Sequence, residues 1–289
     1  MPQVPIDHLE DPRIAPFRHL KRTNETRDNE QFIVEGEKLL DRLLESRYPV
    51  ASVLATERHA PRIEARLPSD TPLYIVAADM ISLIVGFNFH RGVLASGIRR
   101  PGPDLAEIVS GKRSGSAANE GLSTIVVCPT LNNPENLGTI IRIGDVFGVD
   151  AVLVGGSCPD PLSRRVLRVS MGTSLQLPVI VRSDVEAELK RLHDEWGYES
   201  FATVVDPGAE PFDSIPRPKK LALLMGSESE GLDPHWIRLC HRQVTIPMRP
   251  GAESLNVAVA AGVFLYHFSR SLGTSPGPPG PSVPVPGLG

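Results

Sequence analysis

Three polar, glycine-containing segments in the C-terminal part of the chain have residue types suited to binding and catalysis. They are residues 132–138 (NNPENLG), 224–232 (LMGSESEGL) and 246–256 (IPMRPGAESLN). Each lies at the end of an apolar run that predicts a β-strand. Since open parallel α/β sheets bind their ligands beyond the carboxyl ends of the strands, these segments form the candidate functional site.

The first segment contains an asparagine cluster and precedes an arginine. Asn133 or Asn136 could cap the helix predicted over residues 137–147, but capping accounts for one asparagine and not for the cluster. Arg142 lies in the first turns of this helix, where a cation opposes the helix dipole. Both observations favour a functional role for Asn136 and Arg142.

The second and third segments are less specific when each is taken alone. Glycine, serine and glutamate, as found around Gly226 and Glu228, are common in turns. Ser254 is a plausible N-cap for a helix predicted over residues 254–270. Asn256 is harder to explain, because a buried amide at the start of an apolar helix needs hydrogen-bond partners.

Several other kinds of functional site find no support in the sequence. It has no GxxxxGK[ST], GxSxG or HExxH motif, and no GxGxxG follows the first strand. The cysteines, Cys128, Cys158 and Cys240, are far apart and odd in number. This spacing argues against a zinc site and a disulfide framework and favours a reducing cytoplasm. We expect no metal.

The predicted site is carried by alternating strands and helices. Short β-rich runs occur at residues 123–127, 151–154, 201–205, 221–225 and 243–246, and helical patterns at 137–147, 184–196, 234–239 and 254–270. Nearly continuous apolar strands suit a parallel sheet that is covered on both faces. The last helix is apolar nearly all round, which predicts deep burial.

A smaller α/β layer is predicted in the first part of the chain. Its strand candidates are residues 31–34, 52–55, 73–76 and 92–95, with an amphipathic helix at 35–46. The length of 289 residues suggests about two domains. We divide the chain into an N-terminal domain (1–105), a linker rich in Gly, Ser, Pro and Ala (106–121), a second domain (122–272) and a disordered Pro/Gly-rich tail (273–289).

The charge balance and hydropathy limit the possible partners. The net charge of −4 excludes a generally basic protein, so any nucleic-acid contact requires a local basic patch. The longest apolar run, residues 257–266, is about half of the roughly 20 residues that cross a bilayer. The N-terminus lacks the basic start and apolar stretch of a signal peptide. We therefore expect no membrane contact and a cytoplasmic location.

Taken in order, the three segments resemble the signature motifs of the SpoU (TrmH) family of RNA ribose 2′-O-methyltransferases, in the SPOUT superfamily. The matching stretches read NPENLGTIIRIGDVFGVD, LLMGSESEGL and IPMRPGAESLNVAVAAGVFLYHF. Residues 160–178 resemble the segment between the first two motifs. Residues 17–99 resemble, more weakly, the RNA-binding N-terminal domain of many members, a small α/β fold like that of a ribosomal protein.

The resemblance implies a fold, a cofactor and a set of site residues. The second domain would be a parallel α/β sheet with a trefoil knot, working as a homodimer. S-adenosylmethionine would be bound at Gly226, Ile246, Met248 and Leu255. Arg142 would be the central catalytic residue, and Asn136 would orient it or the ribose. Glu228 would anchor Arg142 or the first segment, and Ser254 and Asn256 would complete the site.

The resemblance also implies RNA as the substrate. Two basic stripes are the candidate contacts: Arg13, Arg18, Lys21, Arg22 and Arg27 in the first part, and Arg164, Arg165 and Arg168 in the second. The favoured function is 2′-O-methylation of ribosomal RNA, because such an N-terminal domain commonly accompanies that role. The alternatives are the same reaction on transfer RNA and a catalytically silent RNA-binding or ribosome-assembly protein. The intact set of catalytic residues argues against the silent protein.

Overall fold

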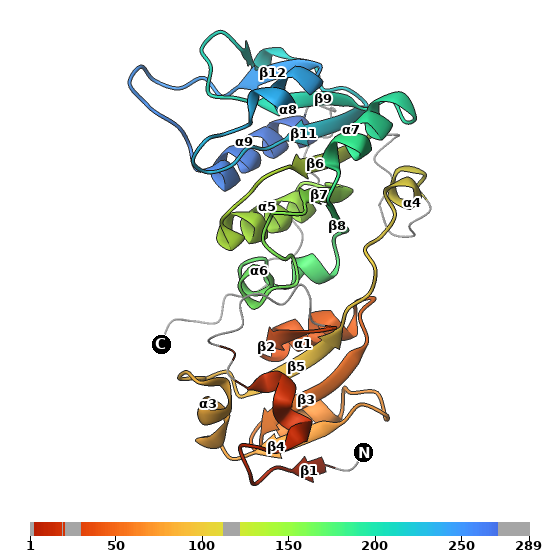
Figure 1. The fold of residues 1–289 in the computed structure, drawn as a ribbon, viewed down its shortest axis with the longest axis vertical. Helices are drawn as coiled ribbons and strands as arrows, with labels where there is room; N and C mark the ends of the chain where they lie inside the picture. Colours follow the sequence, from red (N-terminus) through yellow and green to blue (C-terminus); the bar gives the residue numbers. More distant parts are fainter. Residues whose placement is uncertain (1–2, 19, 21–29, 112–121, 271–289) are drawn as a thin grey trace, which may run out of the picture.

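The computed structural model describes residues 3–18, 20, 30–111 and 122–270 (Figure 1). Two β-sheets follow one another along the long axis of the molecule, the N-terminal one in the lower half of Figure 1. The prediction of two α/β layers is therefore confirmed. The trefoil knot implied by the family resemblance stays a prediction, because strand pairing does not specify how the chain crosses itself.

The C-terminal sheet has seven strands, and all of its pairings are parallel. Their spatial order is β10 (Glu210–Pro211), β12 (Arg242–Thr245), β9 (Glu199–Thr203), β11 (Lys220–Leu224), β6 (Ser123–Cys128), β7 (Ala151–Gly155) and β8 (Val179–Arg182). The apolar character of these strands results from burial on both sides.

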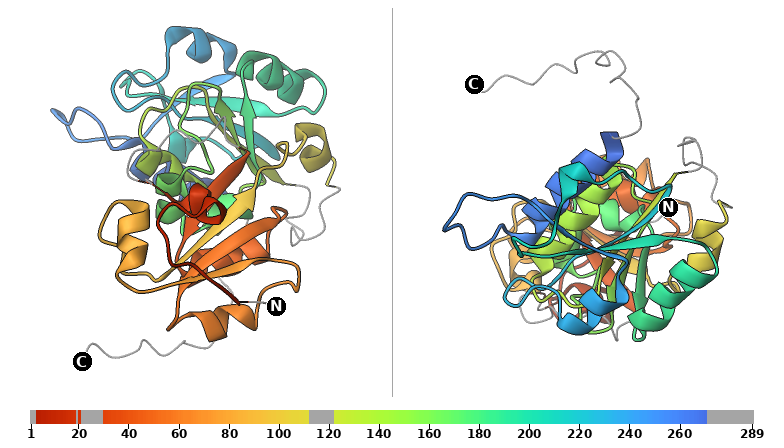
Figure 2. Two further views of the ribbon diagram at one scale, coloured as in Figure 1. Left: turned by 60° about the horizontal axis from the view of Figure 1, so that its bottom comes forward. Right: turned by 90° about the horizontal axis from the view of Figure 1, so that it is seen from above.

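Helices cover both faces of this sheet. Val126 and Cys128 point to the side of α5 (Pro134–Val146) and α9 (Val257–Arg270). Ile125 and Val127, the alternate positions of β6, point to the side that packs against α4 (Leu105–Val109), α7 (Val185–Asp194) and α8 (Pro234–Leu239). In the right-hand view of Figure 2, α9 in dark blue and α7 in teal lie on opposite sides of the sheet.

The N-terminal sheet has five strands in the order β1 (Gln3–Pro5), β4 (Leu73–Val76), β3 (Val50–Thr56), β5 (Val93–Ile98) and β2 (Gln31–Glu35). One face packs against α1 (Glu37–Leu44) and α2 (Ala60–Glu64). The other packs against the 3-10 helix η1 (Pro12–Phe17) and α3 (Met80–Val85). Here β5 runs antiparallel to both β3 and β2.

The two domains share a core. The segment between β7 and β8 forms α6 (Arg164–Val169) and the 3-10 helix η2 (Thr173–Leu175). Leu162, Leu167 and Leu175 from this segment are buried in one cluster with Phe32 and Leu39 of the N-terminal domain. A segment of the C-terminal domain therefore completes the core of the N-terminal one.

Two expectations for helices require correction. The last helix begins at Val257 rather than at residue 254, and it is not deeply buried all round, since Val259 and Tyr266 are 54% and 49% exposed. Within the residues expected to end the first domain and begin the linker, α4 places Leu105 and Ile108 in the core of the C-terminal domain. The expected disordered tail lies outside the described residues.

Candidate functional site

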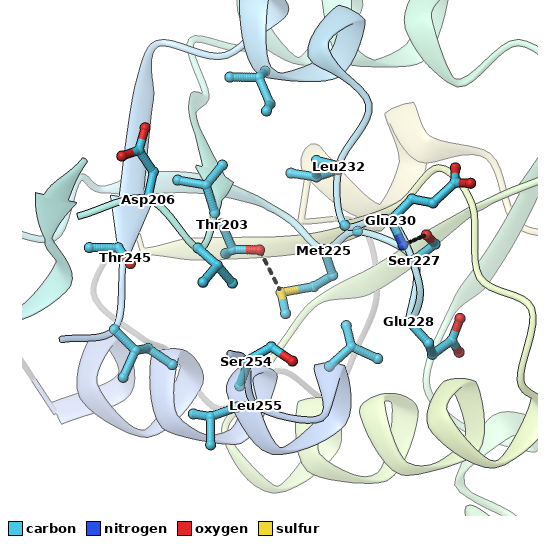
Figure 3. Close-up of a pocket in the computed structure, with 18 of the residues that line it drawn as sticks. Thr203, Asp206, Met225, Ser227, Glu228, Glu230, Leu232, Thr245, Ser254 and Leu255 are labelled. Atoms are coloured by element: carbon cyan, nitrogen blue, oxygen red, sulfur yellow. Dashed lines mark hydrogen bonds between the residues drawn. The ribbon is translucent and has the colours of Figure 1, made fainter. Parts of the chain in front are cut away.

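A pocket of about 570 Å³ lies at the carboxyl ends of β9, β11 and β12. The loops after these strands and the start of α9 surround it (Figure 3). The residues predicted to bind a cofactor, Gly226, Ile246, Met248 and Leu255, all line it. The structure therefore brings together two motifs that are about 20 residues apart in the chain, as expected for parallel strands.

The pocket wall combines apolar side chains with carboxylates. Leu232, Ile246 and Leu255 provide apolar surface, and Asp206 and Glu253 provide negative charge. Such a wall suits a ligand that has an apolar ring system and carries positive charge. The volume also falls in the range of about 300–1,000 Å³ that is usual for small-molecule sites.

Sequence reasoning missed the contribution of the loop after β9. Thr203 lines the pocket and donates a hydrogen bond from its hydroxyl to the carbonyl oxygen of Leu224, 2.8 Å away, which ties β9 to β11. Asp206 follows it at the rim. This contribution could have been predicted, because a parallel strand at β9 ends at the same edge of the sheet as the strands that precede the motifs.

The geometry of the loop after β11 requires glycine at position 226. A Cβ at this position would lie 2.2 Å from the carbonyl carbon of Gly231 and 2.3 Å from the nitrogen of Leu232. The loop closes on itself through paired backbone hydrogen bonds between Ser227 and Gly231. Gly226 therefore permits the loop to close on itself, and its contact with a cofactor stays a prediction.

Glu228 holds the first segment in place. Its carboxylate accepts hydrogen bonds from the backbone N–H groups of Asn132 and Asn133, both 3.1 Å long, and from Nδ2 of Asn136, 2.8 Å long. This arrangement corresponds to one of the two expected roles, anchoring of the first segment. No hydrogen bond or ion pair with Arg142 is found among the described residues.

These hydrogen bonds determine the ionisation of Glu228. Burial by itself would raise the pKa of the carboxyl group, but the hydrogen bonds from Asn136, Asn132 and Asn133 outweigh that effect and lower the pKa from 4.5. The group is therefore an anion at neutral pH. An acceptor fixed in this way orders the loop before any ligand arrives.

Asn136 connects the first and third segments. Its Oδ1 accepts a hydrogen bond of 3.0 Å from Nδ2 of Asn256. The other end of the Asn256 amide, Oδ1, accepts from the backbone N–H groups of Ala258 and Val259 and so caps α9. Asn256 is therefore the N-cap where Ser254 was expected, and Ser254 lines the pocket instead.

Arg142 lies outside this network. Its side chain is exposed on α5, and it has no hydrogen-bond or ion-pair partner among the described residues. It lies six positions after Asn136 in the helix, which places it about 9 Å along the axis and about 120° around it. Val146, 71% exposed, lies one turn further on the same face. In the single chain, Asn136 does not orient Arg142.

The first basic stripe is partly neutralised. Arg13 pairs with Asp11 and Arg18 with Glu10, both at 2.5 Å. The remaining members, Lys21, Arg22 and Arg27, lie outside the described residues.

The second basic stripe requires a correction. Arg164 is 12% exposed and pairs with Glu35, which is 6% exposed, so it links the two domains and is not available to RNA. Arg165 is half-exposed and pairs with Glu135. Arg168 is partly exposed and has no carboxylate partner among the described residues.

The cysteines do not form a reactive centre. Cys128 and Cys158 are buried, and burial raises the pKa of the Cys128 thiol well above its usual value. Burial likewise raises the pKa of Cys240 to about 12.

In the described part of the chain, no group of three or more His, Cys, Asp or Glu side chains is placed to hold a metal ion. Every helix described is too short or too polar to span a bilayer.

Known proteins resemble this chain over most of its length. Residues 123–266 match the model of the SpoU rRNA Methylase family. A protein of Mycobacterium bovis named an uncharacterised tRNA/rRNA methyltransferase is 34% identical, over 91% of this chain and 90% of its own. The 23S rRNA (guanosine(2553)-2′-O)-methyltransferase RlmP of Bacillus subtilis is 27% identical, over 91% and 98%. The solved SpoU methyltransferase AviRb of Streptomyces viridochromogenes, in complex with the cofactor AdoMet, superposes with a TM-score of 0.72 at 25% identity, over 90% and 98%.

Proposed function

The chain belongs to the SpoU rRNA methylase family, and on this premise we propose that it transfers a methyl group from S-adenosylmethionine to a ribose 2′-hydroxyl of ribosomal RNA. The observation that carries the proposal is the hydrogen-bonded connection from Glu228 through Asn136 to Asn256. It joins all three motif segments beside a pocket of suitable size. A loop ordered in this way is expected where a substrate hydroxyl must be held beside a cofactor.

The pocket fits S-adenosylmethionine. Ile246 and Leu255 offer apolar surface to the adenine, and Met248 and the backbone at Gly226 lie beside them. The carboxylates of Asp206 and Glu253 suit its positively charged groups. When bound, the cofactor supplies a methyl group made electrophilic by a sulfonium.

Arg142 is the residue that we propose acts on the ribose. An arginine stays protonated in proteins, so it positions the nucleophile and stabilises developing negative charge on the hydroxyl oxygen or the adjoining phosphate. Asn136, Ser254 and Asn256 hold the ribose and the surrounding loops. Glu228 keeps the first segment fixed while the RNA binds.

We further propose that the protein acts as a homodimer. The face formed by α5 and α9 exposes Val146, Val259 and Tyr266, each by about half or more. A second copy that covered this apolar face would remove the surface from water. Because Arg142 lies on the same face as Val146, pairing would bring it to an RNA site shared by the two copies.

Ribosomal RNA is the favoured substrate because RlmP, matched over nearly its full length, is named for 23S rRNA. Transfer RNA is the second candidate, since the relative at 34% identity is named for both. Either substrate implies a cytoplasmic location. A silent RNA-binding protein is the third possibility.

The decisive experiment compares Arg142→Ala with the unaltered protein. Total RNA from a strain that lacks this gene is incubated with S-adenosylmethionine carrying a labelled methyl group. We expect Arg142→Ala to lower the transfer rate by about 10²- to 10⁴-fold, as for loss of a positioning and charge-stabilising group. Since Arg142 has no partner in the described chain, sedimentation and cofactor calorimetry should be unchanged.

Arg238→Ala is the matched control, because Arg238 is another exposed arginine without a carboxylate partner among the described residues. It should transfer methyl groups at the unaltered rate. Equal transfer by Arg142→Ala would remove Arg142 from the mechanism. Absence of transfer to any RNA despite cofactor binding would favour the silent protein, and label in transfer RNA alone would favour the second candidate.

A further inference from the structure

Basic side chains from both domains meet where the domains join. Lys38 and Arg42 belong to α1, Arg91 to the loop before β5, and Arg165 and Arg168 to α6. We refer to the exposed part of this region, formed by Lys38, Arg91 and Arg168, as the seam surface. The region lies between the two sheets in Figure 1, where α6 packs against β2 and η2 packs against α1.

Specific contacts fix these elements relative to one another. Arg164 Nε donates a hydrogen bond of 2.6 Å to the carboxylate of Glu35, and Arg91 donates one of 3.2 Å to the backbone carbonyl of the same residue. Arg42 donates to the side chain of Gln176, just beyond η2. Lys38 lies one turn before Arg42, and Arg168 one turn after Arg164. Residues one turn apart share a helix face, so the seam surface is held by both domains.

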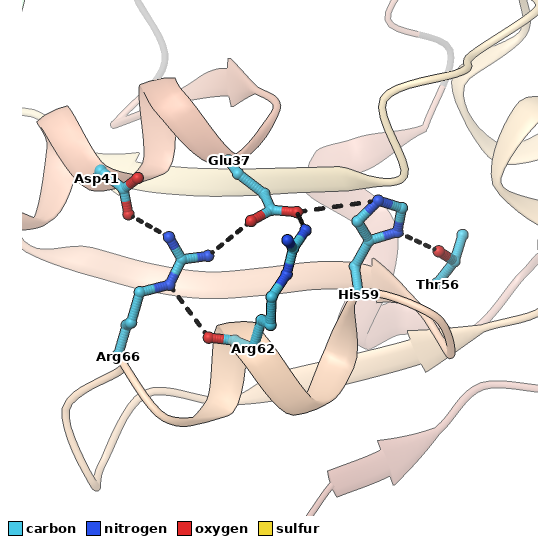
Figure 4. Close-up of polar contacts among 6 residues, drawn as sticks. All are labelled: Glu37, Asp41, Thr56, His59, Arg62 and Arg66. Carbon is cyan, nitrogen blue, oxygen red and sulfur yellow. Dashed lines mark hydrogen bonds and ion pairs between the residues drawn. The ribbon is translucent and has the colours of Figure 1, made fainter. Parts of the chain in front are cut away.

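Several carboxylates around this junction already have arginine partners. Arg66 pairs with Glu37 at 3.0 Å and with Asp41 at 2.6 Å, and Arg62 also pairs with Glu37 (Figure 4). Glu35 is occupied by Arg164. By contrast, Lys38 and Arg91 are exposed and Arg168 is partly exposed, and none of them has a carboxylate partner among the described residues. Their positive charge is therefore available to an external anion.

The seam surface leads to the candidate active site. Arg165, on α6 beside Arg168, pairs with Glu135 at the start of α5. The backbone N–H of Glu135 donates to the side chain of Asn133, whose own N–H donates to Glu228. A chain of contacts thus runs from the junction to the loop that Glu228 anchors.

We propose that the seam surface binds the phosphate backbone of the RNA and guides it across both domains to the active site. This inference rests on the proposed function, because it takes RNA as the substrate. Phosphates are the anions that a row of cations from two domains can bind in succession. The seam surface would act in addition to the N-terminal stripe, in which Arg13 and Arg18 pair with acids.

The test measures how binding of RNA depends on salt. The probe is a short single-stranded RNA of random sequence, titrated with the full-length protein at several salt concentrations. Each phosphate contact contributes about −0.7 to the slope of log K against log salt for single strands. The variant Lys38→Gln/Arg168→Gln should reduce the slope by about 1.4, which lowers affinity about 25-fold near 0.1 M salt.

The control is Lys219→Gln/Arg238→Gln, which removes the same charge from exposed positions of the C-terminal domain away from the junction. Its slope should equal that of the unaltered protein. An unchanged slope in the seam variant, an equal reduction in the control, or lack of RNA binding by the unaltered protein would each overturn the proposal. Because the readout is binding, a protein that binds through the seam but transfers no methyl group would refute only the proposed function.

Discussion

At the scale of single residues, Glu228 offers the sharpest test of how the motif loops are held. Glu228→Gln keeps the shape but removes the charge that accepts hydrogen bonds from Asn132, Asn133 and Asn136. Charge-assisted bonds of this kind are worth about 1.5–3 kcal/mol, and partial exposure reduces that value. We expect a loss of about 1 kcal/mol in the free energy of unfolding, measured in urea near pH 7.

The pH dependence has a definite sign. Because folding lowers the pKa of Glu228 from 4.5, its stabilising effect is complete above that value and is lost as the pH falls through the folded-state pKa. The difference between the unaltered protein and Glu228→Gln should therefore shrink below pH 4.5. Glu230→Gln is the control, since the carboxylate of Glu230 is exposed and makes no hydrogen bond in the described chain. A difference that did not change with pH would contradict the anchoring role.

The roles of single residues were predictable from the sequence where nearby residues determine those roles. Asparagine and glutamate in ordered motifs indicated a polar site, and Glu228 and Asn136 do contact each other. The partner of Arg164 was not predictable, because Glu35 is 129 residues away and belongs to the other domain. The sequence of a run of arginines does not distinguish an arginine that binds RNA from one that pairs with a buried carboxylate.

At the scale of elements, Asn256 has two functions that substitution can separate. Its Oδ1 caps α9 and its Nδ2 donates to Asn136. Asn256→Ala should lower the free energy of unfolding by about 1 kcal/mol, whereas Asn256→Asp restores a good cap and most of that stability. Since Asn256→Asp lacks the amide donor, methyl transfer should stay reduced. Urea unfolding and the labelled-methyl assay measure the two effects.

Ser254→Ala supplies the comparison for the cap. Ser254 lies outside the helix and accepts no cap hydrogen bond among the described residues, so its loss should change stability by less than about 0.5 kcal/mol. Equal destabilisation by Ser254→Ala and Asn256→Ala would contradict the assignment of the cap. Full methyl transfer by Asn256→Asp would limit Asn256 to capping.

Long periodic elements were predictable, and short ones at the junction were not. The strand and helix patterns gave β6, β11, α5 and α7 with boundaries close to those observed. The helix α6 was missed because six residues, three of them arginine, show too little apolar periodicity. Its packing against α5 and against β2 of the N-terminal domain, rather than its own propensity, stabilises it.

At the scale of the whole molecule, the sequence predicted two domains but not how they join. A segment rich in Gly, Ser, Pro and Ala predicted a linker between the domains and did not predict any contact between their cores. In the structure, Leu162 and Leu167 of the C-terminal domain complete the core around Phe32. Apolar residues in a sequence predict that a surface is buried, but they do not identify the segment that packs against it. The core shared by the two domains could therefore be identified only from the structure.

The shared core and the pair between Arg164 and Glu35 should make the domains unfold together, so calorimetry should show one transition for the full chain. Arg164→Ala leaves the Glu35 carboxylate buried without its partner, a change that typically costs about 3–5 kcal/mol. Because this loss of stability weakens the contact between the domains, Arg164→Ala should unfold in two calorimetric transitions instead of one. Arg165→Ala breaks a half-exposed pair and should cost less than about 1 kcal/mol.

The double variant Glu35→Ala/Arg164→Ala distinguishes the ion pair from mere loss of packing at α6. Removing both charges leaves no unpaired ion in the interface, so part of the stability lost in Arg164→Ala should return. A double variant as unstable as the sum of the single ones would show that the charges do not interact. A single transition in Arg164→Ala would show that the apolar contacts of Leu167 suffice to couple the domains. With the pair intact, the seam surface and the active site keep a fixed separation, which an RNA-guiding surface requires to deliver one particular nucleotide.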